Sequence, residues 1–209
     1  MFDTESLYSE VGRELMRRRG VDYPDDLCHA VMGTPPEASF TTMIQWHSLT
    51  DTWQELQEES DAIFLELVKG GFSMMPGLPE LLAEIERFGL PKAVCTSSSP
   101  KLVGPVLAYH NMAPRFDFIL TAADVVQGKP NPEMYLKAAA RFGVKPAEMI
   151  VLEDSVMGTE AALAAGAMTF TVLAEHNQTR TFPPETRLVD RLDAPEVLVA
   201  LDEMHRGEA

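Results

Sequence analysis

Residues 149–172 read MIVLEDSVMGTEAALAAGAMTFTV, and this stretch decides the fold. The apolar run at 149–152 predicts a short buried strand, and the run at 168–173 predicts a second one. Between them, the small-residue segment 156–165 predicts a helix that can lie close to a sheet. A strand, a helix and a strand joined by short loops indicate two parallel neighbours in one sheet.

The same alternation extends over the chain from about residue 78 onward. It predicts helices at about 78–88, 101–110, 132–142 and 196–204, and strands at 92–96, 116–120 and, more weakly, 188–189. This order is typical of an α/β fold with a doubly wound parallel sheet that helices cover on both faces. Ligands of such sheets bind beyond the carboxyl ends of the strands, so the residues that follow each strand are the candidate site residues.

The first part of the chain has a different pattern. Apolar residues recur at helical spacing in residues 7–15 and again in 53–68, with no convincing strand in this part. We therefore expect a small all-helical domain at residues 4–72. The α/β core is then formed by residues 1–3 together with 73–209.

The strand predicted at 92–96 ends in the run Thr96-Ser97-Ser98-Ser99. A hydroxyl at a strand end, followed by free backbone N–H groups at the next helix start, can donate hydrogen bonds to phosphate oxygens. The alternative is a serine-rich loop that only caps the helix predicted from Lys101. This segment alone leaves both interpretations open.

Lys129 stands in the run Gly128-Lys129-Pro130-Asn131-Pro132. We expect Pro130 to hold Lys129 in an extended conformation, Asn131 to cap the next helix and Pro132 to be its first residue. The lysine is then presented by a stiff frame, which matters if its ammonium group has to lie beside transferring phosphoryl charge. The alternative is an exposed lysine beside a proline turn.

Glu153 and Asp154 directly follow the strand predicted at 149–152. Adjacent carboxylates at this place suit a hard cation such as Mg²⁺, which takes oxygen ligands and keeps waters that a phosphate can replace. The small residues of the next helix let it pack closely and fix the position of these acids. The alternative is that Asp154 or Ser155 only caps that helix.

Composition excludes several classes of function. The chain has 209 residues, 45% of them hydrophobic and 23% charged, which is an ordinary globular composition with enough residues for a core. Its formal net charge of -15 repels phosphate backbones and anionic lipid, so we expect neither nucleic acid nor a membrane surface as a partner. A metal ion or a local lysine can still reverse the field in a pocket for an anionic substrate.

The two cysteines, Cys28 and Cys95, lie far apart and outside any CxxC pattern. We therefore expect reduced thiols and a cytoplasmic location. The sequence shows no apolar run of transmembrane length and no charged-then-apolar leader, so we expect no membrane anchor. The five histidines have no ligand spacing, and we expect no zinc site.

Together, the three strand ends resemble the haloacid dehalogenase superfamily, in the branch with a helical cap inserted after the first strand. That branch contains β-phosphoglucomutase-like and phosphoglycolate-phosphatase-like proteins. The order of the family is kept, with a hydroxyl at Thr96, a lysine at Lys129 and the acidic pair Glu153-Asp154. Two segments resemble the family's lysine and acidic motifs: GKPNPEMY at 128–135 and VLEDS at 151–155.

The resemblance implies a Mg²⁺-dependent phosphomonoester hydrolase that acts on a small phosphorylated metabolite. In this family the phosphoryl group passes to an aspartate, and the aspartyl phosphate is then hydrolysed. A second aspartate, two residues after the nucleophile, serves as general acid and base. Thr96 and Lys129 are the implied catalytic residues. The implied ligands are Thr96, Ser97, Ser98 and Lys129 for phosphate, and Asp154 with Glu153 for Mg²⁺.

Both aspartates of the family's first motif are absent from the sequence. That motif reads as an apolar strand, Asp-x-Asp-Gly, two or three residues, and then Asp-Thr-Glu or similar, whereas this chain begins Met1-Phe2-Asp3-Thr4-Glu5. Asp3 matches the later, largely structural aspartate. We therefore expect an N-terminally truncated, inactive chain, with Met1 at an internal start codon and an empty strand slot between the strands ending at Thr96 and Leu152. The rival hypothesis is a true pseudoenzyme, kept for binding or dimerisation.

The alternative activity is that of a sugar-phosphate mutase. Mutases of this branch carry a cap arginine shortly after a glycine, but the matching run Gly33-Thr34-Pro35-Pro36 has none. They also tend to have a histidine in the first cap helix, where Tyr8 stands here. Both differences favour a phosphatase. Trp46 and Trp53 are more often packing residues than sugar platforms, so the cap does not predict the substrate. We expect a monomer or a weak homodimer.

Overall fold

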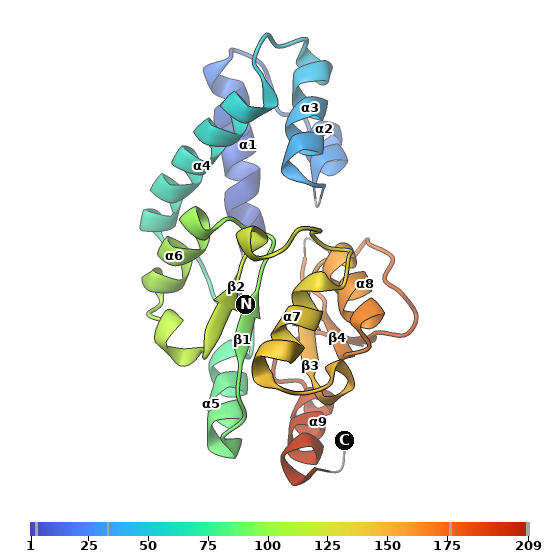
Figure 1. Ribbon diagram of the computed structural model, residues 1–209. Helices are drawn as coiled ribbons and strands as arrows, with labels where there is room; N and C mark the ends of the chain where they lie inside the picture. Colours follow the sequence, from blue (N-terminus) through green and yellow to red (C-terminus); the bar gives the residue numbers. More distant parts are fainter. Residues whose placement is uncertain (3, 33, 176, 208–209) are drawn as a thin grey trace. The chain divides into compact units, whose positions relative to one another are not determined.

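The structure is a computed structural model that describes residues 1–2, 4–32, 34–175 and 177–207 (Figure 1). It divides into two compact units, one of residues 2–73 and one of Met1 with residues 74–209. Asp3, of the N-terminal motif, and Gly33, of the predicted cap loop, lie outside the described residues. No helix in the described ranges is long and apolar enough to span a membrane.

The first unit is helical, as predicted. Its helices are α1 (Glu5–Arg18), α2 (Asp25–Val31), α3 (Pro36–His47) and α4 (Trp53–Gly70). Helix α1 packs against α4, and α3 packs against both α2 and α4, with Leu15, Leu27 and Leu56 fully buried. The side chain of Thr52 accepts a hydrogen bond from the backbone of Glu55, which caps the start of α4.

The second unit has the alternating order that the sequence predicts, and the α/β class is confirmed. Its strands are β1 (Ala93–Cys95), β2 (Phe118–Leu120), β3 (Ile150–Glu153), β4 (Met168–Val172) and β5 (Arg187–Val189). Its helices are α5 (Leu78–Phe88), α6 (Pro100–Tyr109), α7 (Glu133–Phe142), α8 (Val156–Ala165) and α9 (Pro195–Arg206). Short 3-10 helices lie at Ala113–Arg115, Ala122–Asp124 and Pro146–Glu148.

One boundary prediction at the lysine run is wrong. Pro132 is the residue before α7 rather than its first residue. Pro132 is therefore the N-cap, and the prediction that Asn131 is the N-cap is also wrong. The side chain of Asn131 still accepts a hydrogen bond from the backbone N–H of Glu133, the first residue of α7, at 3.0 Å. The peptide bond between Lys129 and Pro130 is cis.

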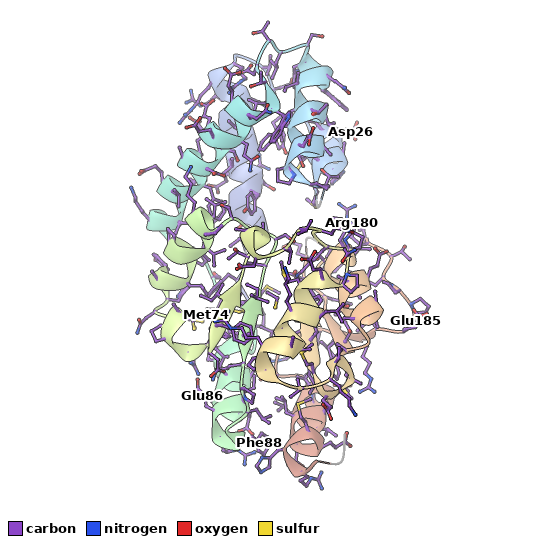
Figure 2. All side chains as sticks on the ribbon, in the orientation of Figure 1. Asp26, Met74, Glu86, Phe88, Arg180 and Glu185 are labelled. Carbon is purple, nitrogen blue, oxygen red and sulfur yellow. The ribbon has the colours of Figure 1, made fainter. Side chains whose placement is uncertain are left out.

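Helix α7 packs against β1 and α8, and α8 packs against β3 and β4. Helices α5 and α9 pack against each other, and the ring centres of Phe88 and His205 lie 4.8 Å apart. Phe88 is labelled in Figure 2. Glu86, also labelled in Figure 2, pairs with Arg115 at 2.9 Å and with Lys92 at 3.3 Å, which ties α5 to the start of β1. These contacts hold the helices around the strands and fix the strand ends.

All strand pairs in the described residues are parallel, as predicted. The strands form two pieces, β1-β2 and β3-β4-β5, and no pairing joins β1 to β3 in the part of the chain that the structure describes. The sheet is thus split at the place where the sequence predicts a missing strand, between the strands that end near Thr96 and Leu152.

Strand β1 has a free edge on the side away from β2. In a parallel ladder, successive residues direct their backbone groups to opposite sides of the strand, so one hydrogen bond identifies the residues on each side. The backbone N–H of Thr96 donates to Leu120 O at 2.9 Å across the pair with β2. The backbone N–H and C=O groups of the even-numbered residues therefore point toward β2. Those of Ala93 and Cys95 point away from β2, and both residues are half-buried.

Strand β3 has a matching free edge. Met168 N donates to Met149 O at 3.0 Å, so the odd-numbered residues of this strand face β4. The backbone groups of Ile150 and Leu152 therefore point away from β4, and these two apolar residues are only half-buried. Each piece of the sheet thus has one apolar parallel edge without a strand partner among the described residues.

Candidate active site

Thr96 follows β1 and begins a turn that is fixed to the end of β2. Its backbone N–H donates to Leu120 O, and its Oγ1 accepts a hydrogen bond from Ser98 N at 3.1 Å. Ser98 O in turn accepts from Ala122 N at 3.1 Å. Because the Thr96 oxygen acts as an acceptor within this turn, its hydroxyl proton is left to donate to a ligand.

The serine cluster does not act as a simple helix cap. Ser99 precedes α6, but its side chain makes no capping hydrogen bond. Its Oγ is buried without a hydrogen-bond partner among the described residues, whereas Ser97, two residues earlier, is exposed. A buried hydroxyl without a partner costs free energy, so the turn has hydrogen-bonding capacity that the chain itself does not use.

Lys129 is buried rather than exposed at a proline turn. Its side chain is only 7% exposed, and its ammonium group forms an ion pair with the Glu153 carboxylate. It also donates to Cys95 O at 3.2 Å, a carbonyl on the free edge of β1, and lies 5.1 Å from the centre of the Tyr135 ring. A single ammonium group thus links the end of β1, next to Thr96, to the end of β3.

The Glu153 carboxylate is fully engaged at the end of β3. It accepts hydrogen bonds from Lys129 and from the phenol of Tyr135, and its Oε2 accepts from Ser155 Oγ at 3.1 Å. Burial raises the pKa of Glu153, but the charge of Lys129 and these hydrogen bonds hold the pKa below its usual value. We call Lys129, Glu153 and Tyr135 the buried cluster.

Burial and the negative charge of Glu153 raise the pKa of Tyr135 well above its ordinary value, and the charge of Asp154 contributes. Burial also raises the pKa of the Cys95 thiol to about 11. Tyr135 therefore remains a neutral hydrogen-bond donor at physiological pH. The phenol thus serves as a hydrogen-bond donor to the Glu153 carboxylate.

Gly158 makes room for the Glu153 carboxylate at the start of α8. A Cβ placed on Gly158 would lie 2.1 Å from Glu153 Oε2, which is far inside contact distance. Ser155 Oγ accepts a hydrogen bond from Gly158 N at 3.0 Å and caps α8. Ser155 is therefore the helix cap, and the carboxylate of Asp154 is not used for that purpose.

Replacement of Gly158 by alanine is expected to lower the free energy of unfolding by about 1–3 kcal/mol, because the new methyl group displaces a buried carboxylate from its partners. The matched control is Gly70→Ala, since a Cβ at Gly70, the last residue of α4, meets no atom within 4 Å. That change should stabilise by up to about 1 kcal/mol through helix propensity. Urea unfolding of both variants is the measurement, and equal effects would contradict the assigned contact.

Asp154 lies next to the buried cluster with its carboxylate free. In the described part of the chain this carboxylate makes no hydrogen bond or ion pair, and only the Asp154 backbone carbonyl is held, by Asn177 Nδ2 at 2.8 Å. The described residues contain no group of three or more His, Cys, Asp or Glu side chains that could hold a metal ion. Mg²⁺ needs only one or two protein carboxylates when waters and substrate phosphate complete its shell, and Asp154 fits that requirement.

Of the residues predicted from the sequence, the structure brings Lys129 and Glu153 into direct contact and links them to the residue before Thr96. Two further residues were missed. Tyr135 was part of the quoted lysine motif, and its place in the first turn of the helix after Lys129 was an available signal. Asn177 lies in a loop without periodicity, and no pattern in the sequence could have identified it.

The chain is similar to known hydrolases. Residues 1–172 match the family described as haloacid dehalogenase-like hydrolase. The chain is 31% identical over 170 residues to the phosphorylated carbohydrates phosphatase of Thermotoga maritima, with 79% of this chain and 77% of that protein covered. It is 32% identical over 172 residues to a probable pseudouridine-5'-phosphatase of Drosophila melanogaster, with 79% and 74% covered.

Among solved structures, CbbY from Rhodobacter sphaeroides in complex with phosphate has a TM-score of 0.82, with 97% of this chain and 94% of that chain covered. The sequence identity is 24%, so this likeness concerns the fold alone.

Proposed function

Because the chain belongs to the haloacid dehalogenase-like hydrolase family, we propose that it forms a Mg²⁺-dependent phosphomonoester hydrolase that acts on a small phosphorylated metabolite. The observation that carries the proposal is the buried Lys129 ammonium group, held between the end of β1 and the Glu153 carboxylate. A buried cation beside a hydroxyl-bearing strand end suits the binding of a dianionic phosphoryl group. The relatives named above as phosphatases support the same reaction class.

Each site residue has a proposed role. The hydroxyl of Thr96 and the backbone N–H of Ser97 bind phosphoryl oxygens, with the Ser98 hydroxyl nearby, since the N–H of Ser98 already donates to Thr96 Oγ1. Lys129 offsets the negative charge on phosphate and nucleophile. Asp154 is the direct ligand of Mg²⁺, and Glu153 supports the metal site by holding Lys129 beside it. The bound Mg²⁺ would neutralise charge on the phosphate.

We further propose that the phosphoryl-accepting aspartate comes from a strand between β1 and β3, contributed by polypeptide outside these 209 residues. Strand β1 has an apolar edge that faces away from β2, and β3 has one that faces away from β4. The residues on these two edges are only half-buried. A strand in this slot would satisfy the backbone groups of Ala93 and Ile150. Its carboxyl end would lie at the same edge as Thr96 and Asp154, since the carboxyl ends of parallel strands coincide.

The test is hydrolysis of an aryl phosphate with and without Mg²⁺, by the 209-residue chain and by a form extended at its N-terminus with the residues encoded upstream. Mg²⁺-dependent hydrolysis by the extended form alone is the expected result. Hydrolysis by the 209-residue chain would refute the assignment of an outside nucleophile. Absence of hydrolysis in both forms would instead support a non-catalytic binding protein.

A further inference from the structure

Asn177 is a buried residue, 3% exposed, whose side-chain amide joins three backbone positions. Its Nδ2 donates to Asp154 O at 2.8 Å and to Val172 O at 3.0 Å, and its Oδ1 accepts from Ala174 N at 2.8 Å. Both amide hydrogens and the amide oxygen are therefore used. The side chain ties the turn after β3 to the end of β4.

The hydrogen bond to Asp154 is not needed to close the loop in which Asn177 lies. That loop is already closed by the backbone of Asn177, whose N–H donates to Ala174 O at 3.0 Å, and by the Oδ1 contact to Ala174 N. The Nδ2 contact instead reaches back 23 positions along the chain to the carbonyl of Asp154. It therefore serves the turn after β3 rather than its own loop.

This contact holds the backbone of Asp154. The neighbouring Ser155 is held at the cap of α8 by its bond with Gly158 N, and Glu153 is held within the buried cluster. Asn177 adds a third restraint at the Asp154 carbonyl, between these two held residues. Because the backbone sets the direction of Cβ, this restraint limits the region that the Asp154 carboxylate can reach through rotation of its side chain.

We propose that Asn177 is a positioning residue that orients the Asp154 carboxylate for a divalent cation, and this proposal rests on the metal role assigned to Asp154 above. Residues that hydrogen-bond to a metal ligand orient it without touching the metal. Removing one of them typically weakens metal binding by about 10-fold or more. Asn177 meets Asp154 through the backbone and thus acts without touching the cation.

The test measures the binding of Mn²⁺ to the 209-residue chain. The electron paramagnetic resonance signal of free Mn²⁺ reports the unbound ion, so no turnover is required. Asn177→Ala should weaken Mn²⁺ binding by about 10-fold. Asn177→Ser keeps a hydroxyl near Ala174 N but is too short to reach Asp154 O, and it should weaken binding similarly while disturbing the loop less. Urea unfolding of each variant separates a loss of affinity from a loss of fold.

The matched control is Thr186→Val. Thr186 Oγ1 also ties the segment after β4 to the strand, through Thr171 Oγ1 at 2.8 Å and Thr169 O at 3.3 Å, but it does not contact Asp154.

Mn²⁺ affinity lost in both Asn177 variants and kept in Thr186→Val supports the proposal. If Asp154→Asn weakens binding and the Asn177 variants do not, the positioning role is overturned and the metal site stands. If Asp154→Asn has no effect, the metal role of Asp154 and this inference both fail.

Discussion

Replacement of Lys129 by methionine is expected to lower the free energy of unfolding by about 3–5 kcal/mol, because it leaves a buried carboxylate without its counter-charge. Both partners are almost completely buried, with 7% of the Lys129 side chain and 8% of the Glu153 side chain exposed. Methionine replaces the length of the lysine stem, so the effect reports the charge rather than a cavity. Urea unfolding at neutral pH measures it.

The double variant Lys129→Met/Glu153→Gln should recover most of this loss, since a buried ion pair replaced as a whole costs far less than one broken in half. Glutamine keeps an oxygen that can accept the hydrogen bond of Tyr135. The difference between the double variant and the sum of the single variants gives the coupling energy of the pair.

The matched control is Lys137→Met on α7. Its ammonium group pairs with Glu133 at 2.6 Å, but the lysine side chain is 46% exposed, so solvent screens the pair and the loss should stay below about 1 kcal/mol. Equal losses for Lys129→Met and Lys137→Met would show that the Lys129 ammonium group is solvated and would contradict the buried cluster.

The cost of Lys129→Met should also depend on pH. In the parent chain the charge of Lys129 and the hydrogen bonds to the carboxylate hold the pKa of Glu153 below its usual value. A carboxyl whose pKa is lowered by folding stabilises the native state above its unfolded pKa, and that contribution is lost as pH falls through the folded pKa. The stability difference between parent and variant is therefore greatest near neutral pH and shrinks below about pH 4.5.

The second large effect concerns turnover in the extended form that carries the proposed strand, and it rests on the proposed function. Lys129→Ala should lower kcat for aryl phosphate hydrolysis by about 100-fold or more, because a preorganised cation is lost where phosphoryl charge develops.

Asp154→Asn should raise the Mg²⁺ concentration required for half-maximal activity by about 10-fold or more, because the direct ligand loses its charge.

Two charge-removing variants on exposed helix faces serve as controls for these measurements. Lys137→Ala removes an ammonium group from α7, and Asp202→Asn removes a carboxylate that pairs with Arg206 at 2.8 Å on α9. Both should leave kcat and Mg²⁺ dependence unchanged. Unchanged kinetics in Lys129→Ala or in Asp154→Asn, with folded protein in each case, would count against the site.

The sequence was sufficient to predict the order and type of the elements in the α/β unit. Apolar periodicity is a local property, and it placed α5 and α8 at the bounds that the structure has. The predicted strand bounds differ from the observed ones by one or two residues. At β1, for example, the prediction is 92–96 and the strand is Ala93–Cys95, because the end residues of a short strand have no periodicity to mark them. Asp154 follows β3 as predicted, whereas Glu153 is the last residue of that strand rather than the first residue after it.

The sequence by itself determined the α/β class, through the alternation of strands and helices, and the resemblance to the haloacid dehalogenase family, through the local motifs around Thr96, Lys129 and Glu153-Asp154. Only the tertiary structure decided which of these groups are paired. Hydrogen bonds and charge pairs depend on distance in space, so Lys129 and Glu153, 24 positions apart, form an ion pair, while the neighbouring Asp154 carboxylate has no partner among the described residues. The same reason gives Asn177 its contact with Asp154, which no sequence pattern could predict.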